Sequence, residues 1–197
     1  MHKKPTLFFF FFCCVLIGKA QLLPQSVSIK VQLNQIINDF PSEFSSVKGE
    51  RVEGEPNTIQ YQSKIQPKGA LETRVIGYPS KQKTYWVWES KLLVTDDINQ
   101  LKRIYKTYYN DIAGNNVTIS SGGRLVATTV YAAPSDELRL WINQFKIKEP
   151  VGVFESLVVD LIAEYNNFEW IIYLRIYDQA KEADTNTSNE NDELNRL

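Results

Sequence analysis

Short runs of β-branched and aromatic residues, separated by turn-forming residues, recur through most of this chain. Runs of this kind are typical of antiparallel strands, because a tight turn can join consecutive strands only when they run in opposite directions. The runs cover residues 48–53, 58–66, 71–77, 84–94, 117–119, 123–132, 137–147, 153–165 and 169–178. The first four predict an antiparallel meander, and Asn166-Asn167 predicts a tight hairpin between the last two.

Two segments have the spacing of an amphipathic helix. In residues 33–39 the apolar positions recur at three- and four-residue steps, and Pro41 ends the helix. In residues 97–113 one stripe contains Ile98, Leu101, Ile104, Tyr105, Tyr108 and Ile112. Acidic residues at its start supply a cap, and Gly114 supplies a left-handed stop. The alternating apolar residues at 27–31 predict either a strand or the first turn of the first helix.

These elements predict a single α+β domain over residues 21–177. One or two helices would pack on a curved antiparallel sheet of about eight strands, which buries one apolar face of each element. Each half, 27–94 and 95–177, would contain a helix followed by about four strands, which suggests the hypothesis of a duplicated helix-plus-four-strand unit. A shift of 72 positions lays Asn38-Asp39 on Asn110-Asp111 and the strand at Thr84 on the one at Ser156.

The N-terminal segment has the three-part pattern of a secretory signal peptide. Residues 1–4 include two lysines, an apolar run follows, and residues 18–20 place small residues at the cleavage positions. The apolar run is shorter than the about 20 residues that a membrane-spanning helix needs. We predict cleavage after Ala20, and therefore an exported protein, periplasmic or extracellular, without a stable membrane span. A lipoprotein modified at Cys13 or Cys14, or an uncleaved anchor, is the alternative.

Cleavage would remove Cys13, Cys14 and the only histidine, His2. A mature chain without thiol and imidazole groups excludes a Ser-His triad, thiol catalysis and zinc sites built on nitrogen or sulfur ligands. No metal and no cofactor is predicted. The domain would depend on a hydrophobic core alone, and an exported domain without disulfides fits the bacterial envelope or exterior.

The C-terminal residues 178–197 are rich in Asn, Asp, Glu and Thr, have no apolar period, and are predicted to be a disordered acidic tail. The 22 basic and 23 acidic residues become 17 of each without the three lysines of residues 1–20 and the tail's six acids and two bases. A balanced domain has no electrostatic footprint for nucleic acid, so no nucleic-acid partner is expected.

Carboxylates are the strongest remaining candidates for catalysis. Asp160 and Glu164 lie in an otherwise apolar strand segment, and strand alternation places both on one face with Ile162 between them. Two carboxylates at the correct separation can hydrolyse a glycosidic bond. A solvent-facing row of scattered polar residues is the competing interpretation.

Aromatic residues in the strands are the candidates for ligand binding. Trp86 and Trp88 are two positions apart on one strand, so their rings share a face, and Tyr105 and Tyr108 lie on the helix stripe. Such residues either fill the core between sheet and helix or line a cavity for an apolar or sugar-like ligand.

The sequence therefore predicts an exported, non-enzymatic binding or interaction protein of the bacterial envelope or exterior. Its partner would be a protein or a small apolar or sugar-like ligand. A carboxylate-dependent hydrolase of envelope or extracellular glycans is the alternative, and a subunit whose sheet edges are completed by another chain is a third hypothesis.

Overall fold

The computed structural model describes residues 28–81, 83–117 and 123–181. The predicted signal peptide, residues 1–20, lies outside the described residues, as does the predicted tail beyond residue 181. Within the described part of the chain, no helix is both long and apolar enough to cross a membrane.

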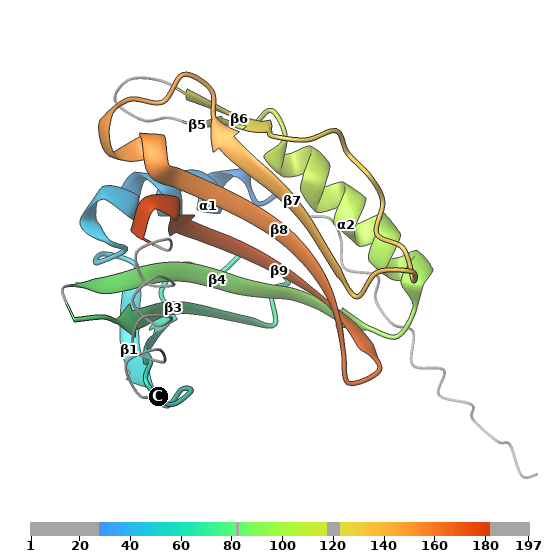
Figure 1. Cartoon of the computed structure of the whole chain (residues 1–197), viewed down its shortest axis with the longest axis horizontal. Coiled ribbons are helices and arrows are strands. Elements are labelled where there is room, and N and C mark those ends of the chain that lie inside the picture. Colours follow the sequence, from blue (N-terminus) through green and yellow to red (C-terminus); the bar gives the residue numbers. More distant parts are fainter. Residues whose placement is uncertain (1–27, 82, 118–122, 182–197) are drawn as a thin grey trace, which may run out of the picture.

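An antiparallel sheet with two helices packed on it forms the domain, which confirms the predicted α+β fold (Figure 1). The strands are β1 (Lys48–Val52), β2 (Ile59–Ser63), β3 (Glu72–Pro79), β4 (Thr84–Thr95), β6 (Gly123–Ala127), β7 (Leu140–Ile147), β8 (Leu157–Asn166) and β9 (Glu169–Asp178). Their order in space is β1-β2-β3-β4-β9-β8-β7-β6, and the two-residue β5 (Asn116–Val117) extends the sheet beyond β6.

The two halves of the chain meet at the centre of the sheet, where β4 pairs with β9 along most of its length. Each half contains one helix followed by antiparallel strands, as predicted. The strand order makes β4 the counterpart of β9, whereas the shift of 72 positions lays β4 on β8. The duplication therefore stays a hypothesis, and that shift does not follow the symmetry of the sheet.

Both helices cover the same face of the sheet. Helix α1 (Lys30–Asp39) begins directly after Ile29, so the alternating residues near 29 belong to a helix start rather than to a strand. Helix α2 (Ile98–Ile112) is capped by Asp97, whose carboxylate accepts a hydrogen bond from the amide of Asn99. One core cluster joins Leu33, Ile36 and Ile37 of α1 and Leu101, Tyr105 and Ile112 of α2 to the sheet residues Val75, Trp88, Leu92, Phe145, Val159, Leu161, Ile172 and Leu174.

Strand β8 starts four residues later than predicted. Residues Gly152–Ser156 form a 3-10 turn instead, because Glu149 and Gly152 both have positive φ, 54° and 60°, and reverse the chain there. The first residues of the predicted tail also have structure: the amides of Ala180 and Lys181 donate to the carboxylate of Asp178 in a short helical turn.

Side-chain alternation gives the sheet a second face that carries neither helix, and we call it the open face. On β4 the core side chains Trp88 and Leu92 point toward the helices, so Glu89 and Lys91 point away from them. The same alternation on β9 places Leu174 in the core and Arg175 on the open face. The aromatic candidates therefore lie on the helix-covered face, whereas the carboxylate candidates lie on the open face.

Candidate functional site

The predicted aromatic candidates on β4 lie on the helix-covered face. Trp88 is completely buried in the core, and its indole Nε1 donates a hydrogen bond to Ser63 Oγ at 3.1 Å. Trp86 is half-buried, with its ring centroid 6.0 Å from that of Tyr61 and 3.2 Å from the ammonium of Lys48. The two rings therefore pack against neighbouring side chains of the domain.

The two tyrosine candidates of α2 contribute to the same core. The buried hydroxyl of Tyr105 donates to the carbonyl oxygen of Leu161 at 2.7 Å, and burial raises the pKa of this hydroxyl. Tyr108 is half-buried against the core, and burial raises its pKa as well. Both tyrosines therefore have a structural role, because they pack α2 on the sheet.

The two carboxylate candidates share the open face, as predicted, but have different surroundings. Asp160 is buried and accepts a hydrogen bond from the hydroxyl of Tyr177 at 2.9 Å, whereas Glu164 is half-exposed. Four residues of extended strand separate their Cα atoms by about 13 Å, and Ile162 lies between them. Paired glycosidase carboxylates need about 5–9.5 Å between their carboxyl groups, so the backbone does not bring these two together.

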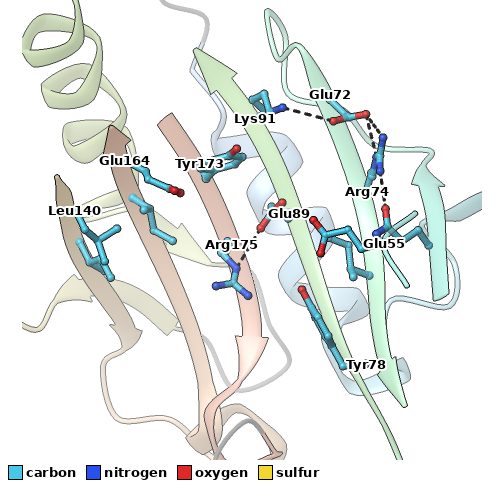
Figure 2. A pocket seen from close by; sticks show the side chains of 14 residues that line it. Glu55, Glu72, Arg74, Tyr78, Glu89, Lys91, Leu140, Glu164, Tyr173 and Arg175 are labelled. Carbon is cyan, nitrogen blue, oxygen red and sulfur yellow. Dashed lines mark hydrogen bonds and ion pairs between the residues drawn. The ribbon is translucent and has the colours of Figure 1, made fainter. Parts of the chain in front are cut away.

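The open face contains a pocket of about 520 Å³, which we call the central hollow. Side chains from β2, β3, β4, β9, β8 and β7 contribute to it, which shows that the middle of the sheet is hollowed on this side (Figure 2). The lining residues are Glu55, Gln60, Glu72, Arg74, Ile76, Tyr78, Glu89, Lys91, Leu140, Ile142, Ile162, Glu164, Tyr173 and Arg175.

One side of the hollow is a network of paired charges over β3, β4 and β9 (Figure 2). Arg175 Nε lies 3.3 Å from Glu89 Oε2, and these residues are register partners on β9 and β4. On β3, Arg74 donates from Nε to Glu72 at 2.9 Å and from a terminal nitrogen to Gln60 at 2.6 Å. The network fixes the orientation of these planar groups.

Arg175 lies between two carboxylates, because it is in register with Glu89 on one side and with Asp160 on the other. Burial raises the pKa of Glu89, while the charges of Arg175 and Lys91 act in the opposite direction. Burial also raises the pKa of Asp160, against the hydrogen bonds from Tyr177 and Gln144. In both cases desolvation exceeds the stabilisation that the neighbouring groups give to the charged form.

The other side of the hollow is apolar. Tyr173 on β9, Ile162 on β8 and Ile142 on β7 are direct register neighbours, so their side chains form one continuous row. Ile142 is 46% exposed and Leu140 is 53% exposed, which is high for residues of this size in a strand. Glu164 stands beside this row (Figure 2).

Most residues of the hollow have no distinctive pattern in the sequence. Glu89, Lys91, Tyr173 and Arg175 are visible in the sequence only as polar residues that alternate with core positions on two strands. Their proximity depends on the pairing of β4 with β9, two strands that are more than 70 residues apart in sequence. Among the described residues, no group of three or more histidine, cysteine, aspartate and glutamate side chains could hold a metal ion.

The chain has no significant match to a protein-family model, to a curated protein or to a solved structure.

Proposed function

We propose that this chain is an exported, non-enzymatic binding protein that holds its ligand in the central hollow. The observation that carries the proposal is the hollow itself: paired, partly desolvated charges and an apolar row line one pocket on the sheet face that carries neither helix. The volume of about 520 Å³ is within the usual size range of small-molecule sites, and seven of the 14 lining residues are charged.

The charge network is difficult to explain by stability alone. The side chains of Glu89 and Arg175 are only 28% and 25% exposed, so both charges have lost much of their hydration. Such pairs are often no more stabilising than apolar residues of the same volume, because desolvation offsets their attraction. A role in binding gives a reason for oriented charges in a half-buried position.

The predicted ligand residues on the helix-covered face are packed in the core, which supports a binding site on the open face instead. Trp88 and Tyr105, two of the predicted ligand residues, have their polar atoms hydrogen-bonded inside the core. Their side chains are completely buried. A ligand on that side would have to displace packed residues, whereas the central hollow is open.

The edge strands of the sheet do not favour the hypothesis that another chain extends the sheet. Strand β1 has only five residues, contains a register irregularity between Lys48 and Arg51, and carries charged side chains. Short, irregular and charged edge strands are the features that oppose pairing with a second sheet. At the other edge, β5 covers the start of β6.

A carboxylate-dependent glycan hydrolase is the second candidate, and one observation favours it. Glu89 lies in the hollow with a pKa raised by burial, which is the property of a general acid. The bound guanidinium of Arg175 weakens this candidate, because it stabilises the charged form of Glu89. The detection of shortened glycans after incubation with the protein would support it.

Ligand-observed NMR tests the binding proposal. The mature chain would be screened against a mixture of neutral sugars, amino acids and short fatty acids. Ile142→Glu places a charge on the apolar row at an exposed position, and Val31→Glu makes the same change on the exposed surface of α1, at 66% exposure. The proposal predicts binding that Ile142→Glu abolishes and Val31→Glu retains. Binding that survives in Ile142→Glu would contradict it.

A further inference from the structure

We infer that the central hollow recognises an uncharged oligosaccharide, with one sugar ring on the apolar row and its hydroxyl groups on the charged side. This inference rests on the proposed binding function and specifies the ligand class. Four properties of the lining carry it: its charge balance, its oriented hydrogen-bonding groups, its apolar row and its size.

The charges of the lining nearly cancel. Arg74, Lys91 and Arg175 face Glu55, Glu72, Glu89 and Glu164, which leaves one negative charge in excess. Each of the three cations is within 4 Å of a carboxylate of the hollow: Arg74 and Lys91 of Glu72, and Arg175 of Glu89. An anionic ligand would have to compete with these carboxylates, so a phosphate or carboxylate ligand does not fit the lining.

The carboxylate of Glu89 offers more acceptor positions than its ion pair uses. A carboxylate has about four acceptor sites, and Arg175 Nε lies 3.3 Å from one oxygen of Glu89. Because the ion pair orients Glu89, its acceptor positions are fixed before a ligand binds. A ligand rich in hydroxyl groups can donate to this carboxylate without carrying a charge.

Glu164 adds an acceptor on the opposite side. No ion pair among residues 28–81, 83–117 and 123–181 involves Glu164, although it lines the same hollow. Its carboxylate stands next to Tyr173, whose pKa is raised by burial and by the charges of Glu89, Glu164 and Glu72. Hydroxyl donors of a ligand ring on Tyr173 would therefore meet carboxylates on both sides.

The apolar row provides a platform for the ring itself. A pyranose ring has a C–H face that packs on aromatic and aliphatic side chains, and Tyr173, Ile162 and Ile142 present such a surface across three strands. A purely apolar ligand would cover Glu89 and Glu164 without donating a hydrogen bond to either carboxylate. A purely polar ligand would leave Leu140 and Ile142 exposed.

The size of the hollow fits a short oligosaccharide. Pockets for drug-sized ligands have volumes of about 300–1,000 Å³, and the hollow, at about 520 Å³, lies within that range. It spans strands from β2 to β7, so a chain of sugar units can lie across the strands.

Binding of the mature chain to an array of immobilised glycans tests this inference. The array would contain neutral oligosaccharides of glucose, mannose, xylose, galactose and N-acetylglucosamine, together with uronate-containing, sulfated and amine-bearing counterparts. We expect a neutral member to bind and its charged counterparts to bind at least about tenfold more weakly, which corresponds to about 1.4 kcal/mol. Binding should change little between low and moderate salt, because it does not depend on a net charge.

Two variants of Tyr173 give the matched comparison. Tyr173→Phe keeps the ring and should bind the neutral glycan within about threefold of the wild type, whereas Tyr173→Ala should lose about tenfold or more. Circular dichroism would show that both variants are folded. Equal losses in the two variants would show that the hydroxyl, not the ring, carries the contact and would contradict the stacking geometry.

The inference and the proposed function can fail separately. If all neutral glycans fail to bind while the ligand screen still shows binding that Ile142→Glu abolishes, the hollow is a binding site and the glycan class is wrong. Preferential binding of a charged glycan also overturns the inference. If Ile142→Glu has no effect on any binding, the proposed function fails with it.

Discussion

Glu89 and Arg175 lie directly opposite each other on β4 and β9, with Arg175 Nε 3.3 Å from Glu89 Oε2 on the sheet face that carries no helix. The pair joins the two halves of the chain at the centre of the sheet. It is also the middle of the charged side of the central hollow, so the same contact bears on stability and on binding.

Removal of one member of this pair should be more destabilising than removal of both. Arg175→Met leaves Glu89 and Asp160 partly desolvated without the cation between them, and the free energy of unfolding should fall by about 1–3 kcal/mol. Arg175→Met combined with Glu89→Met should recover part of this loss, because an apolar pair replaces the ionic one. Denaturant unfolding of the two single variants and the double variant measures the coupling. A double variant as unstable as the sum of the single variants would contradict the pairing.

The buried carboxyl group of Asp160 should make stability depend on pH. Its pKa in the folded state is raised above the ordinary value of 3.8 because burial disfavours the charged form. The folded state therefore binds the proton more tightly than the unfolded state, so this group contributes stability below pH 3.8, and that contribution is lost as the pH rises through the folded pKa. The stability of Asp160→Asn relative to the wild type should increase as the pH rises over this interval.

Unfolding measured from pH 3.5 upward checks this dependence. Glu169→Gln, at an exposed position on β9, is the matched control for loss of one negative charge. A stability difference between Asp160→Asn and wild type that is constant with pH would contradict a raised pKa.

Trp88 should be important for stability and not for binding. Its side chain is completely buried, and Trp88→Ala should lower the free energy of unfolding by about 3–5 kcal/mol, the usual cost of such a cavity. Trp88→Phe, which loses the hydrogen bond to Ser63 but keeps a ring, should be less destabilising. Ligand binding by folded Trp88→Phe should equal that of the wild type. Weaker binding without loss of stability would place the ligand on the helix-covered face.

A glycine at position 168, in the hairpin between β8 and β9, should stabilise the protein. Asn167 and Phe168 have φ angles of 49° and 67°, and Phe168 is 86% exposed. The tight hairpin turn that needs positive φ at both central residues favours Asn followed by Gly. Phe168→Gly should therefore raise the free energy of unfolding by about 1 kcal/mol.

Phe168→Ala is the control for the hairpin, because it removes the ring and keeps the Cβ atom that makes positive φ unfavourable. It should show little gain. If both variants are less stable than the wild type by the same amount, the prediction is contradicted, because the ring of Phe168 would then make a stabilising contact.

Export can be tested on the full-length protein. If residues 1–20 are a signal peptide, the protein produced in a bacterial host should be found outside the cytoplasm. Its mass should be that of a chain whose first residue is Gln21. Retention of residues 1–20 would contradict this prediction. Lipid attached at Cys13 or Cys14 would identify a lipoprotein instead.

The fold could be predicted largely because local patterns determine its elements. The apolar stripe and the acidic residues at its start predicted a helix over 97–113, and α2 spans Ile98–Ile112 with Asp97 as its cap. Period-two alternation and Asn166-Asn167 predicted the last hairpin, which β8 and β9 form with its turn one residue later, at Asn167-Phe168. The start of β8 was predicted too early, because Val153 and Phe154 have strand propensity but follow the positive-φ residue Gly152.

The candidate site could be predicted only in part, since it depends on contacts between distant segments. Asp160 and Glu164 were placed on one face correctly, but the depth of Asp160 and the neighbours of Glu164 depend on strand order. The aromatic candidates Trp86 and Trp88 lie on the helix-covered face and not in the hollow. Strand alternation shows which side chains share a face, but it does not show which face the helices cover. A pattern of alternating charges on β3, β4 and β9 becomes a pocket only when these strands are adjacent.

The methyl NMR signals of the isoleucines give the most direct test of ligand binding in the central hollow. The mature chain would be titrated with the mixture of neutral sugars, amino acids and short fatty acids. We predict that the signals of Ile142 and Ile162, which line the hollow, shift on binding, while those of the core residues Ile36 and Ile172 stay unchanged. Shifts at Ile36 and Ile172 without shifts at Ile142 and Ile162 would contradict the account and place the binding site under the helices.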